Sequence, residues 1–202
     1  MFSVIIPTMW RSDRTLPMLR KLNDCDHVSE IILIDNDTNK TPELDFEKLV
    51  YVPQLTNIYV NPAWNLGVKS SKEDLICILN DDISFDVDRV MWNMSFVTKD
   101  LGCIGLDYMS FNYDGDEVLI ARGHDIGKGW GCAMWLDKKE WSPIPEDIKI
   151  WYGDNWIVDN YDNCYKVVFD AETEMSTTCK DESLADVINS DNEKWNELRL
   201  VS

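Results

Sequence analysis

The sequence has few residues that bind structural zinc, and it has no long apolar segment. It contains two histidines and six cysteines, and no two cysteines form a C-x-x-C pair. This pattern argues against a zinc site and favours reduced thiols in a reducing compartment. No stretch approaches the roughly 20 apolar residues of a membrane span, and the first residues lack a basic start followed by an apolar core. We therefore expect a cytoplasmic protein without a membrane span.

Two common phosphate-binding loops are also missing. The sequence has no G-x-x-x-x-G-K-[ST] motif, and no G-x-G-x-x-G motif follows its first apolar run. These absences argue against a P-loop ATPase and against a dinucleotide-dependent dehydrogenase. A glycine-dense run occurs only at residues 127–131 (GKGWG), and we interpret it as a flexible loop able to close over a substrate.

Positive charge is scarce in this chain. There are 19 Lys and Arg residues against 37 Asp and Glu residues, which gives a formal net charge of −18. Such a protein repels phosphate backbones at long range, so nonspecific nucleic-acid binding is disfavoured, although a local basic groove stays possible. The sequence shows no internal repeat and no Pro/Ser-rich linker, and its 202 residues predict a single domain.

The first half of the chain alternates strand and helix signals. Short apolar, β-branched runs are typical of strands that are buried on both faces, and they occur at residues 2–7, 30–34, 75–79 and 101–106, with shorter candidates at 49–52 and 57–60. Helical spacing of apolar residues follows at 16–22 and 87–97, and Asn61-Pro62 is typical of an N-cap and first helical residue. The alternation predicts a Rossmann-like, mostly parallel α/β sheet flanked by helices.

The second half is more mixed. We expect strands at residues 117–121, 132–136 and 165–169, a short helix at 151–161, and one or two amphipathic helices after Glu182. The chain (residues 1–202) is thus expected to be one domain with a nucleotide-type half (1–106), a more mixed half (107–180) and a helical tail (181–202).

Polar clusters stand at the ends of three predicted strands: Pro7-Thr8, Asp35-Asn36-Asp37 and Asn80-Asp81-Asp82. Ligands of open parallel sheets bind beyond the carboxyl ends of the strands. Carboxylate and amide oxygens suit Mg²⁺ or Mn²⁺, and such an ion would relieve the repulsion between Asp81 and Asp82. Each cluster is also compatible with an ordinary solvated turn, and this is the preferred interpretation of residues 35–37 taken alone.

Four motifs, taken in order, resemble those of a family-two, GT-A-fold glycosyltransferase: FSVIIPTMWR, EIILIDND, NPAWNLGV and DLICILNDDISF. The family's D-x-D motif falls on residues 80–82, with asparagine in the first position. The resemblance covers roughly residues 2–178. It implies a nucleotide-sugar pocket formed by Pro7, Thr8, Arg11, Asp35, Asn65, Gly67, Asn80 and Asp81, and a Mn²⁺ or Mg²⁺ ion held by Asp82 with help from Asp81.

The resemblance extends less specifically into the second half, and it implies that residues 107–180 form the acceptor and catalytic half while residues 1–106 bind the nucleotide sugar. The run at residues 129–141 (GWGCAMWLDKKEW) is similar to the family's glycine-led acceptor strand, and WYGDNW at 151–156 resembles the start of its catalytic helix. This implies that Asp154 is the catalytic base, and the ordinary Asp pKa near 4 predicts an ionised group at pH 7. The flanking Trp130, Trp151 and Trp156 are expected to stack on the acceptor. The family often has a metal-binding histidine where this chain offers Glu174 and Met175, and His124 is an alternative.

The resemblance implies a metal-dependent, inverting hexosyl- or pentosyltransferase that moves a sugar from a nucleotide diphosphate sugar, by analogy a UDP-sugar, to an acceptor hydroxyl. A saccharide acceptor is favoured. The short form and the run YVNPAWNLGV also resemble small glycosyltransferases of tailed bacteriophages, some of which act on hydroxymethylated bases in DNA. The alternative function is therefore that of a phage-type enzyme that works in the cytoplasm of the host cell and transfers the sugar to DNA. A non-catalytic nucleotide-sugar binding module and a nucleotidyltransferase also stay open.

Overall fold

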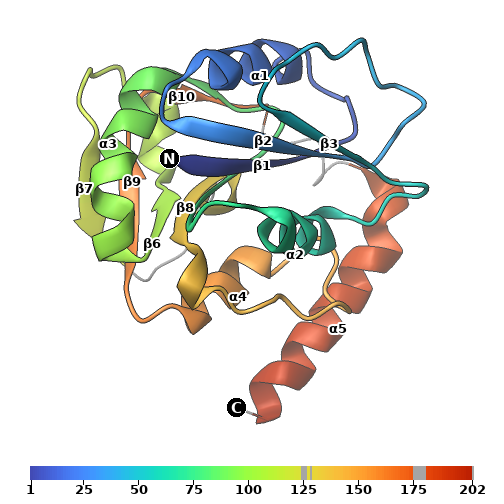
Figure 1. Cartoon of the computed structure of the whole chain (residues 1–202). Coiled ribbons are helices and arrows are strands. Elements are labelled where there is room, and N and C mark those ends of the chain that lie inside the picture. The colour runs from blue at the N-terminus through green and yellow to red at the C-terminus, as the bar shows by residue number, and fades with distance from the viewer. Residues whose placement is uncertain (124–126, 128, 175–180, 202) are drawn as a thin grey trace.

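The computed structural model describes residues 1–123, 127, 129–174 and 181–201. Its centre is a sheet of eight strands in the order β3-β2-β1-β4-β8-β6-β9-β7, and two short strands, β5 and β10, form a second sheet (Figure 1). The strands are β1 (Phe2–Thr8), β2 (Val28–Asp35), β3 (Leu49–Pro53), β4 (Leu75–Leu79), β5 (Ser84–Phe85), β6 (Cys103–Leu106), β7 (Leu119–Arg122), β8 (Ala133–Asp137), β9 (Cys164–Val168) and β10 (Ala171–Glu172).

Five α-helices and several short 3-10 helices connect these strands in the described part of the chain. The α-helices are α1 (Thr15–Asp24), α2 (Val60–Ser70), α3 (Val87–Leu101), α4 (Gly153–Asn160) and α5 (Ala185–Val201). The 3-10 helices include η1 (Tyr108–Asn112), η2 (Trp130–Cys132), η3 (Lys138–Glu140) and η5 (Glu182–Leu184).

The strands from the first half form a parallel block. Strands β3, β2, β1 and β4 are adjacent and parallel, and the register places Thr8 of β1 beside Asp35 of β2. The apolar runs of β1 and β2 are fully buried on both faces of the sheet, which explains why their sequences do not alternate between apolar and polar residues. The parallel register brings the polar ends of these strands to one edge, as the sequence predicts.

Strand β8 joins the two halves of the chain. It pairs antiparallel with β4 on one side and with β6 on the other, and β6 then pairs parallel with β9. One continuous sheet therefore runs through both halves, parallel in the first and mixed in the second. The α/β fold class predicted from the sequence is confirmed.

Helices cover both faces of the sheet. Helices α1 and α3 pack on one face, where apolar side chains such as Leu19 and Met91 join the larger core cluster (Figure 1). Helices α2, α4 and α5 contribute Trp64, Ile157 and Trp195 to a second cluster on the opposite face. Within the described part of the chain, no helix combines the length and the apolarity needed to cross a membrane. The five described cysteines are buried and free, and Cys179 lies outside the described residues.

The structure corrects the sequence prediction around residue 60. Residues 57–59 are irregular rather than a strand, and α2 begins at Val60 with Tyr59, at φ 68°, in the N-cap position. Asn61 is therefore inside the helix, and its side-chain amide donates to the carbonyl oxygen of Trp151 at 2.9 Å. The residue type that caps a helix in an isolated segment here bonds to a segment 90 residues away. The tail forms one α-helix after the short η5.

Candidate nucleotide and catalytic site

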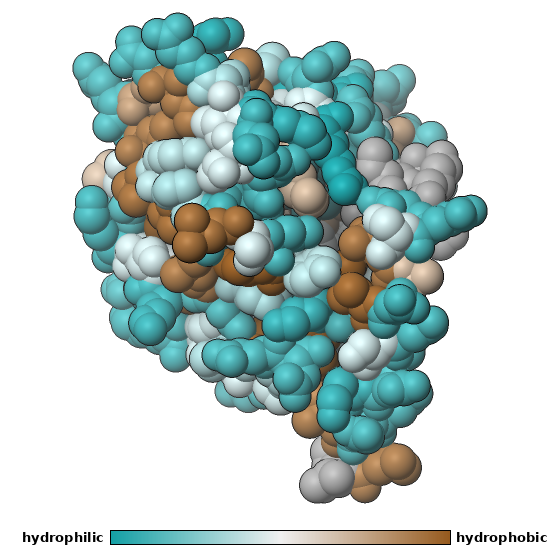
Figure 2. Space-filling model, turned by 90° about the vertical axis from the view of Figure 1, so that its right-hand side faces the viewer, coloured by the Kyte–Doolittle hydropathy of each residue, from teal (hydrophilic) through white to brown (hydrophobic). Residues whose placement is uncertain are grey.

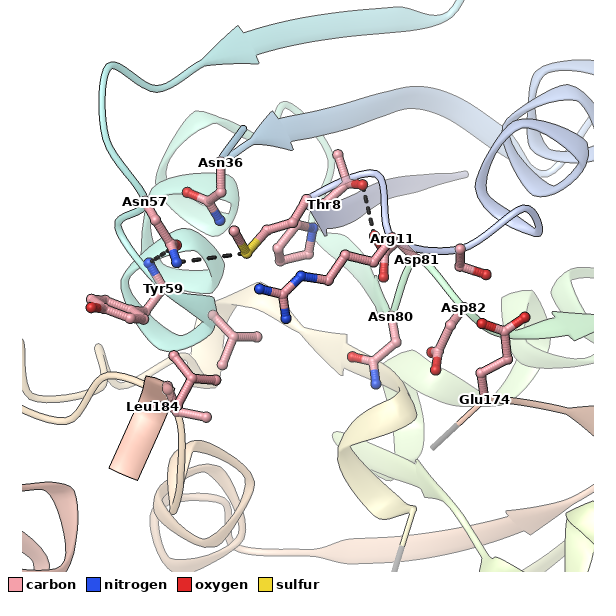
Figure 3. Close-up of a pocket in the computed structure, with 15 residues that line it drawn as sticks. Thr8, Arg11, Asn36, Asn57, Tyr59, Asn80, Asp81, Asp82, Glu174 and Leu184 are labelled. Carbon is pink, nitrogen blue, oxygen red and sulfur yellow. Dashed lines mark hydrogen bonds between the residues drawn. The ribbon is translucent and has the colours of Figure 1, made fainter. Parts of the chain in front are cut away.

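A pocket lies beyond the carboxyl ends of β1 and β4. Figure 2 looks onto the side of the molecule shown at the right of Figure 1; this side is largely hydrophilic, and α5 projects from its lower end. The pocket is lined by Pro7, Thr8, Met9, Arg11, Ser12, Asn36, Asn57, Tyr59, Val60, Asn80, Asp81, Asp82, Ile150, Glu174 and Leu184 (Figure 3). Five of the expected donor-site residues and the expected metal ligand Asp82 are therefore on its wall.

Thr8 and Asp81 join the ends of β1 and β4. The Thr8 hydroxyl donates to Asp81 Oδ2 at 2.7 Å and accepts a hydrogen bond from the Trp10 backbone N–H at 2.9 Å. Burial raises the pKa of Asp81; the Thr8 hydrogen bond opposes this, and the charge of Asp82 adds to it. Two adjacent carboxyls therefore share a site that disfavours their charged forms unless a cation is present.

Asp82 has an unsatisfied oxygen on the pocket wall. The residue is 8% exposed, and its Oδ1 is buried without a hydrogen-bond partner in the described structure. Burial raises the pKa of Asp82, and the nearby charge of Glu174 contributes to the shift. Figure 3 shows the carboxylates of Asp82 and Glu174 side by side on this wall. An unpaired buried oxygen is costly in a folded protein, so it indicates a missing partner.

These acids fit a divalent ion of the magnesium type. Among the described residues, no group of three or more His, Cys, Asp or Glu side chains is arranged to hold a metal by itself. Mg²⁺, however, is usually bound by one or two carboxylates together with waters and substrate phosphates. The unsatisfied oxygen of Asp82 and the hard donors around it meet this requirement. His124 and Met175, considered as further ligands, lie outside the described residues.

Asp154 lies in the first turn of α4. Its Oδ1 accepts a hydrogen bond from the Asn155 backbone N–H at 2.9 Å, and burial raises its pKa. The expectation of an ordinary pKa is therefore corrected: the surroundings of this carboxylate make it a stronger base than a solvated Asp. A raised pKa brings a general base closer to the pH at which it works.

The segment Gly131-Cys132 lies near both Asp82 and Asp154. Burial raises the pKa of Cys132 to about 12, and the negative charges of both aspartates contribute to this shift. The Cys132 carbonyl also accepts a hydrogen bond from the Asn80 backbone N–H at 2.9 Å. A Cβ on the preceding Gly131 would lie 3.5 Å from Asp154 Oδ2. The segment Gly131-Cys132 therefore borders both the end of β4, which leads to Asp82, and the first turn of α4, which carries Asp154.

Packing against α2 determines how α4 begins. A Cβ on Gly153 would lie 2.1 Å from Asn61 Oδ1 and 2.9 Å from the Trp64 ring. Only glycine permits this approach, and the preceding Tyr152 adopts a left-handed backbone conformation with φ 64°. The close contact places Asp154 directly after the point where the two helices meet.

Arg11 lies in the pocket but already has an acidic partner. Its guanidinium is 3.1 Å from the carboxylate of Asp181, which precedes η5. Figure 3 shows the Arg11 side chain extending across the opening between the β1 end and Leu184. A diphosphate bound here would compete with Asp181 for this cation.

The structure places Asp35 behind the pocket rather than in its wall. Asp35 is fully buried, and its carboxylate accepts hydrogen bonds from the hydroxyls of Thr41 and Tyr51 and from the Asp37 backbone N–H. Burial raises the pKa of Asp35, but these hydrogen bonds together lower it below its ordinary value. The adjacent Asn36 lines the pocket instead. Asp35 and Asn36 are therefore enclosed by the protein, which corrects the interpretation of this cluster as a solvated turn.

Asn65 and Gly67 of α2 lie outside the pocket. The Asn65 amide donates to the Ile144 carbonyl at 2.8 Å, and its oxygen accepts from the Ile144 N–H at 2.9 Å. A Cβ on Gly67 would lie 2.3 Å from Ile5 Cγ2. The motif that contains both residues thus serves helix packing against the sheet and against the 144 segment.

The three candidate tryptophans occupy different environments. Trp130 is 1% exposed, and its ring fills the space where a Cβ on Gly105 would lie, so it has no free ring face for an acceptor. Trp151 and Trp156 are partly exposed beside Asp154, and the Trp156 indole donates to the Ser142 carbonyl at 3.2 Å. Of the three candidate tryptophans, Trp151 and Trp156 therefore keep partly exposed side chains.

Sequence reasoning missed eight residues of the pocket wall, namely Met9, Ser12, Asn36, Asn57, Tyr59, Val60, Ile150 and Leu184. Asn36 belongs to the acidic cluster at the β2 end, so its position gave a usable signal. Leu184 comes from the tail, and its sequence carries no sign of a nearby nucleotide-type pocket.

Solved structures share this arrangement of the chain. The crystal structure of TarS 1–349 from S. aureus matches with a TM-score of 0.60 and 14% sequence identity, over 82% of this chain and 57% of that one. The chain has a GT-A-like fold. HddC from Yersinia pseudotuberculosis matches with a TM-score of 0.54 and 13% identity, over 85% of this chain and 92% of its own.

A structure of TarS 1–349 in complex with UDP-GlcNAc also shares the GT-A-like fold, with a TM-score of 0.57 and 13% identity, over 87% of this chain and 60% of that one. The chain thus spans less than two thirds of the TarS fragment. At these identities the likeness shows the fold alone. No protein-family model and no curated protein matches the sequence.

Proposed function

We propose that this protein is a glycosyltransferase that moves a sugar from a nucleotide diphosphate sugar, of the UDP type, to an acceptor hydroxyl with inversion. The observation that carries the proposal is that the segment Gly131-Cys132 borders both acids: the Cys132 carbonyl bonds to the Asn80 N–H, two residues before Asp82, and Asp154 Oδ2 lies 3.5 Å from the position of a Cβ on Gly131. One acid has the unsatisfied oxygen expected of a metal ligand, and the other is a partly buried carboxyl whose pKa is raised by its surroundings, as suits a general base. A binding module would need the first acid but not the second.

The donor diphosphate is proposed to lie between the β1 end and Asp82. Structures of TarS that share this fold were determined in complex with UDP and with UDP-GlcNAc, which supports a uridine nucleotide as donor. Thr8, Arg11 and Asn36 face the pocket that would hold the nucleotide. Arg11 is the one cation among the described residues that line this pocket. Exchange of its Asp181 partner for phosphate oxygens would compensate the loss of the ion pair.

Asp82, with help from Asp81, would hold Mn²⁺ or Mg²⁺. The ion would supply Lewis-acid stabilisation of charge on the leaving phosphate oxygen, which is worth several kcal/mol. The ion would also satisfy the unpartnered Oδ1 of Asp82 and keep both carboxyls ionised despite burial.

Asp154 would receive the acceptor proton. In the proposed reaction the acceptor oxygen attacks the anomeric carbon as the bond from that carbon to the diphosphate oxygen breaks. The hydroxyl proton passes to the Asp154 carboxylate, and the nucleoside diphosphate leaves with the electron pair of the broken bond. A well-placed general base contributes about 10²–10⁴-fold to such a rate.

The acceptor is proposed to be a saccharide. Trp151 and Trp156 are partly exposed beside Asp154 and offer flat apolar surfaces of the kind on which sugar rings stack. The formal charge of −18 opposes the approach of a DNA backbone. Hydroxymethylated DNA is therefore tested as the alternative acceptor and is not part of the proposal.

The experiment is incubation of the protein with a panel of nucleotide sugars and Mn²⁺, with and without oligosaccharides or hydroxymethylated DNA. We expect release of nucleoside diphosphate, faster with a saccharide acceptor, and a product of inverted anomeric configuration by NMR. Nucleotide binding without turnover would instead indicate a binding module. Release of pyrophosphate from a nucleoside triphosphate and a sugar phosphate would indicate a nucleotidyltransferase, and a mass shift of DNA alone would indicate the phage-type activity.

A further inference from the structure

The carboxylate of Asp191 is completely buried although it lies on the C-terminal helix α5. Its Oδ1 accepts a hydrogen bond from the Lys149 backbone N–H at 2.8 Å. Its Oδ2 accepts hydrogen bonds from the N–H groups of Ile150 at 2.7 Å and of Trp151 at 2.9 Å. A single side chain thus satisfies three consecutive backbone donors in the segment that leads into α4.

Two further contacts join α5 to the same segment. The rings of Tyr152 and Trp195 are stacked, with centroids 5.0 Å apart and planes 4° from parallel. The Tyr152 hydroxyl donates to Asn192 Oδ1 at 2.5 Å. Tyr152 has φ 64°, a conformation that costs free energy for a non-glycine residue and persists only where the surroundings hold it.

The segment held by α5 connects the two parts of the candidate site. Ile150 lines the nucleotide pocket, and Asp154 follows Trp151 by three residues. The first turn of α4 has little conformational freedom, because three charge-assisted hydrogen bonds hold the backbone at 149–151 and the Tyr152 side chain is fixed by its contacts with α5. Helix α5 therefore restrains the backbone from which the candidate base projects.

We propose that Asp191 is a positioning residue for the reaction, which acts by fixing residues 149–151 so that Asp154 lies in reach of the acceptor hydroxyl. This inference rests on the proposed function, because it gives Asp154 the role of base. A displacement of about 1 Å of a reacting group can lower a rate about 100-fold. Loss of this anchor is therefore expected to reduce turnover more than donor binding.

The test uses the full chain with Asp191→Asn, and the exposed neighbour Glu193→Gln on the same helix is the matched control for exchange of a carboxylate for an amide. The asparagine has nearly the same shape, but its amide group would face backbone donors and lose hydrogen bonds. We expect kcat for donor turnover to fall about 10- to 100-fold in Asp191→Asn, with the Kd for UDP within about threefold of the parent protein. Glu193→Gln should change neither quantity. Circular dichroism and thermal unfolding verify that the variants are folded at the assay temperature.

A double-variant cycle separates positioning from general loosening of the fold. If Asp191 acts through Asp154, Asp191→Asn should lower the residual rate of Asp154→Asn by less than twofold, since residues that act as a unit are strongly non-additive. Any of three results would overturn the inference. These are an unchanged kcat in Asp191→Asn, an effect on the Kd for UDP larger than the effect on kcat, and a double variant that is slower than Asp154→Asn by the whole factor that Asp191→Asn causes in the parent protein. If Asp191→Asn does not fold, Tyr152→Phe replaces it in the test, because this substitution removes only the hydroxyl hydrogen bond to Asn192. We expect Tyr152→Phe to lower kcat several-fold, and an unchanged kcat would overturn the inference.

Absence of turnover in the parent protein would refute the proposed function itself. That outcome is distinct from normal turnover in Asp191→Asn, which would refute only the positioning role.

Discussion

Replacement of Asp154 by asparagine tests the proposed chemistry most directly. Asparagine has nearly the same shape as aspartate, and its side-chain oxygen can still accept the hydrogen bond from the Asn155 N–H that Oδ1 accepts at 2.9 Å. Asp154 does not line the nucleotide pocket. The substitution is therefore expected to remove the base without disturbing the fold or the donor site.

The expected loss follows from the role of a general base. Such a base contributes about 10²–10⁴-fold, which corresponds to about 3 to 5 kcal/mol in the activation barrier. Initial rates of nucleotide release measure this loss, and calorimetric titration with UDP measures donor binding, which should stay within about twofold. A rate within tenfold of the parent protein, or a parallel loss of UDP binding, would refute the assignment.

The pH dependence adds an independent check on Asp154. Burial raises its pKa above the ordinary 3.8, and the base acts only when deprotonated, so the acid limb of the rate profile should have its midpoint above that value. A raised folded-state pKa also means that the folded protein favours the neutral carboxyl over the charged one. The stability that this preference gives is complete below the unfolded-state pKa and is lost as pH rises through the folded-state pKa. Asp154→Asn should therefore be more stable than the parent protein at pH 7 in urea unfolding, and this advantage should vanish below about pH 4.

Three further substitutions test other parts of the site. Asp82→Asn is expected to abolish both turnover and the rise in melting temperature that Mn²⁺ plus UDP gives the parent protein; a persistent rise would place the ion elsewhere. Asn36→Ala removes one hydrogen-bonding amide from the pocket wall, and a hydrogen bond to UDP is worth about 0.5–1.5 kcal/mol. Calorimetry should therefore show UDP binding weakened about 2- to 10-fold. Unchanged binding would show that Asn36 does not contact the nucleotide. Gly153→Ala introduces a Cβ 2.1 Å from Asn61 Oδ1. Because this overpacks the contact between α2 and α4, urea unfolding should show a free energy of unfolding lower by about 1–3 kcal/mol, and turnover should be slower. Unaltered stability would contradict the described packing of α2 against α4.

The parallel half of the fold was predictable because the local apolar pattern of its strands indicates that they are buried. The apolar runs that became β1, β2 and β4 are uninterrupted, which is the pattern of strands covered on both faces. The polar residues that end these runs were expected at one edge of the sheet, and the register of β1 with β2 confirms that Thr8 and Asp35 are neighbours. Strand order in the second half carried no comparable signal, since the antiparallel insertion of β8 between β4 and β6 depends on contacts distant in sequence.

The resemblance to a glycosyltransferase family named six of the fifteen residues that line the pocket, but it could not assign their individual environments. Asp35 and Asn36 are adjacent in sequence, and only the folded chain shows that the first is enclosed by Thr41 and Tyr51 while the second faces the pocket. In the same way, Trp130 resembles an acceptor residue in sequence yet fills the core beside Gly105. A motif specifies residue types and spacing, whereas the direction of a side chain depends on the groups packed around it.

The amino-acid sequence by itself determined an α/β sheet with acids at its strand ends, because hydrophobic periodicity and strand-ending polar residues are local properties of the chain. The tertiary structure alone decided which buried polar groups are satisfied and by which partners. Asp191 reaches Trp151 across 40 residues of chain, and Asp82 Oδ1 has no hydrogen-bond partner among the residues that the structure describes. The physical reason is that each buried polar atom must find a partner in three dimensions, and that partner is determined by how distant elements pack and not by the neighbouring residues in the sequence.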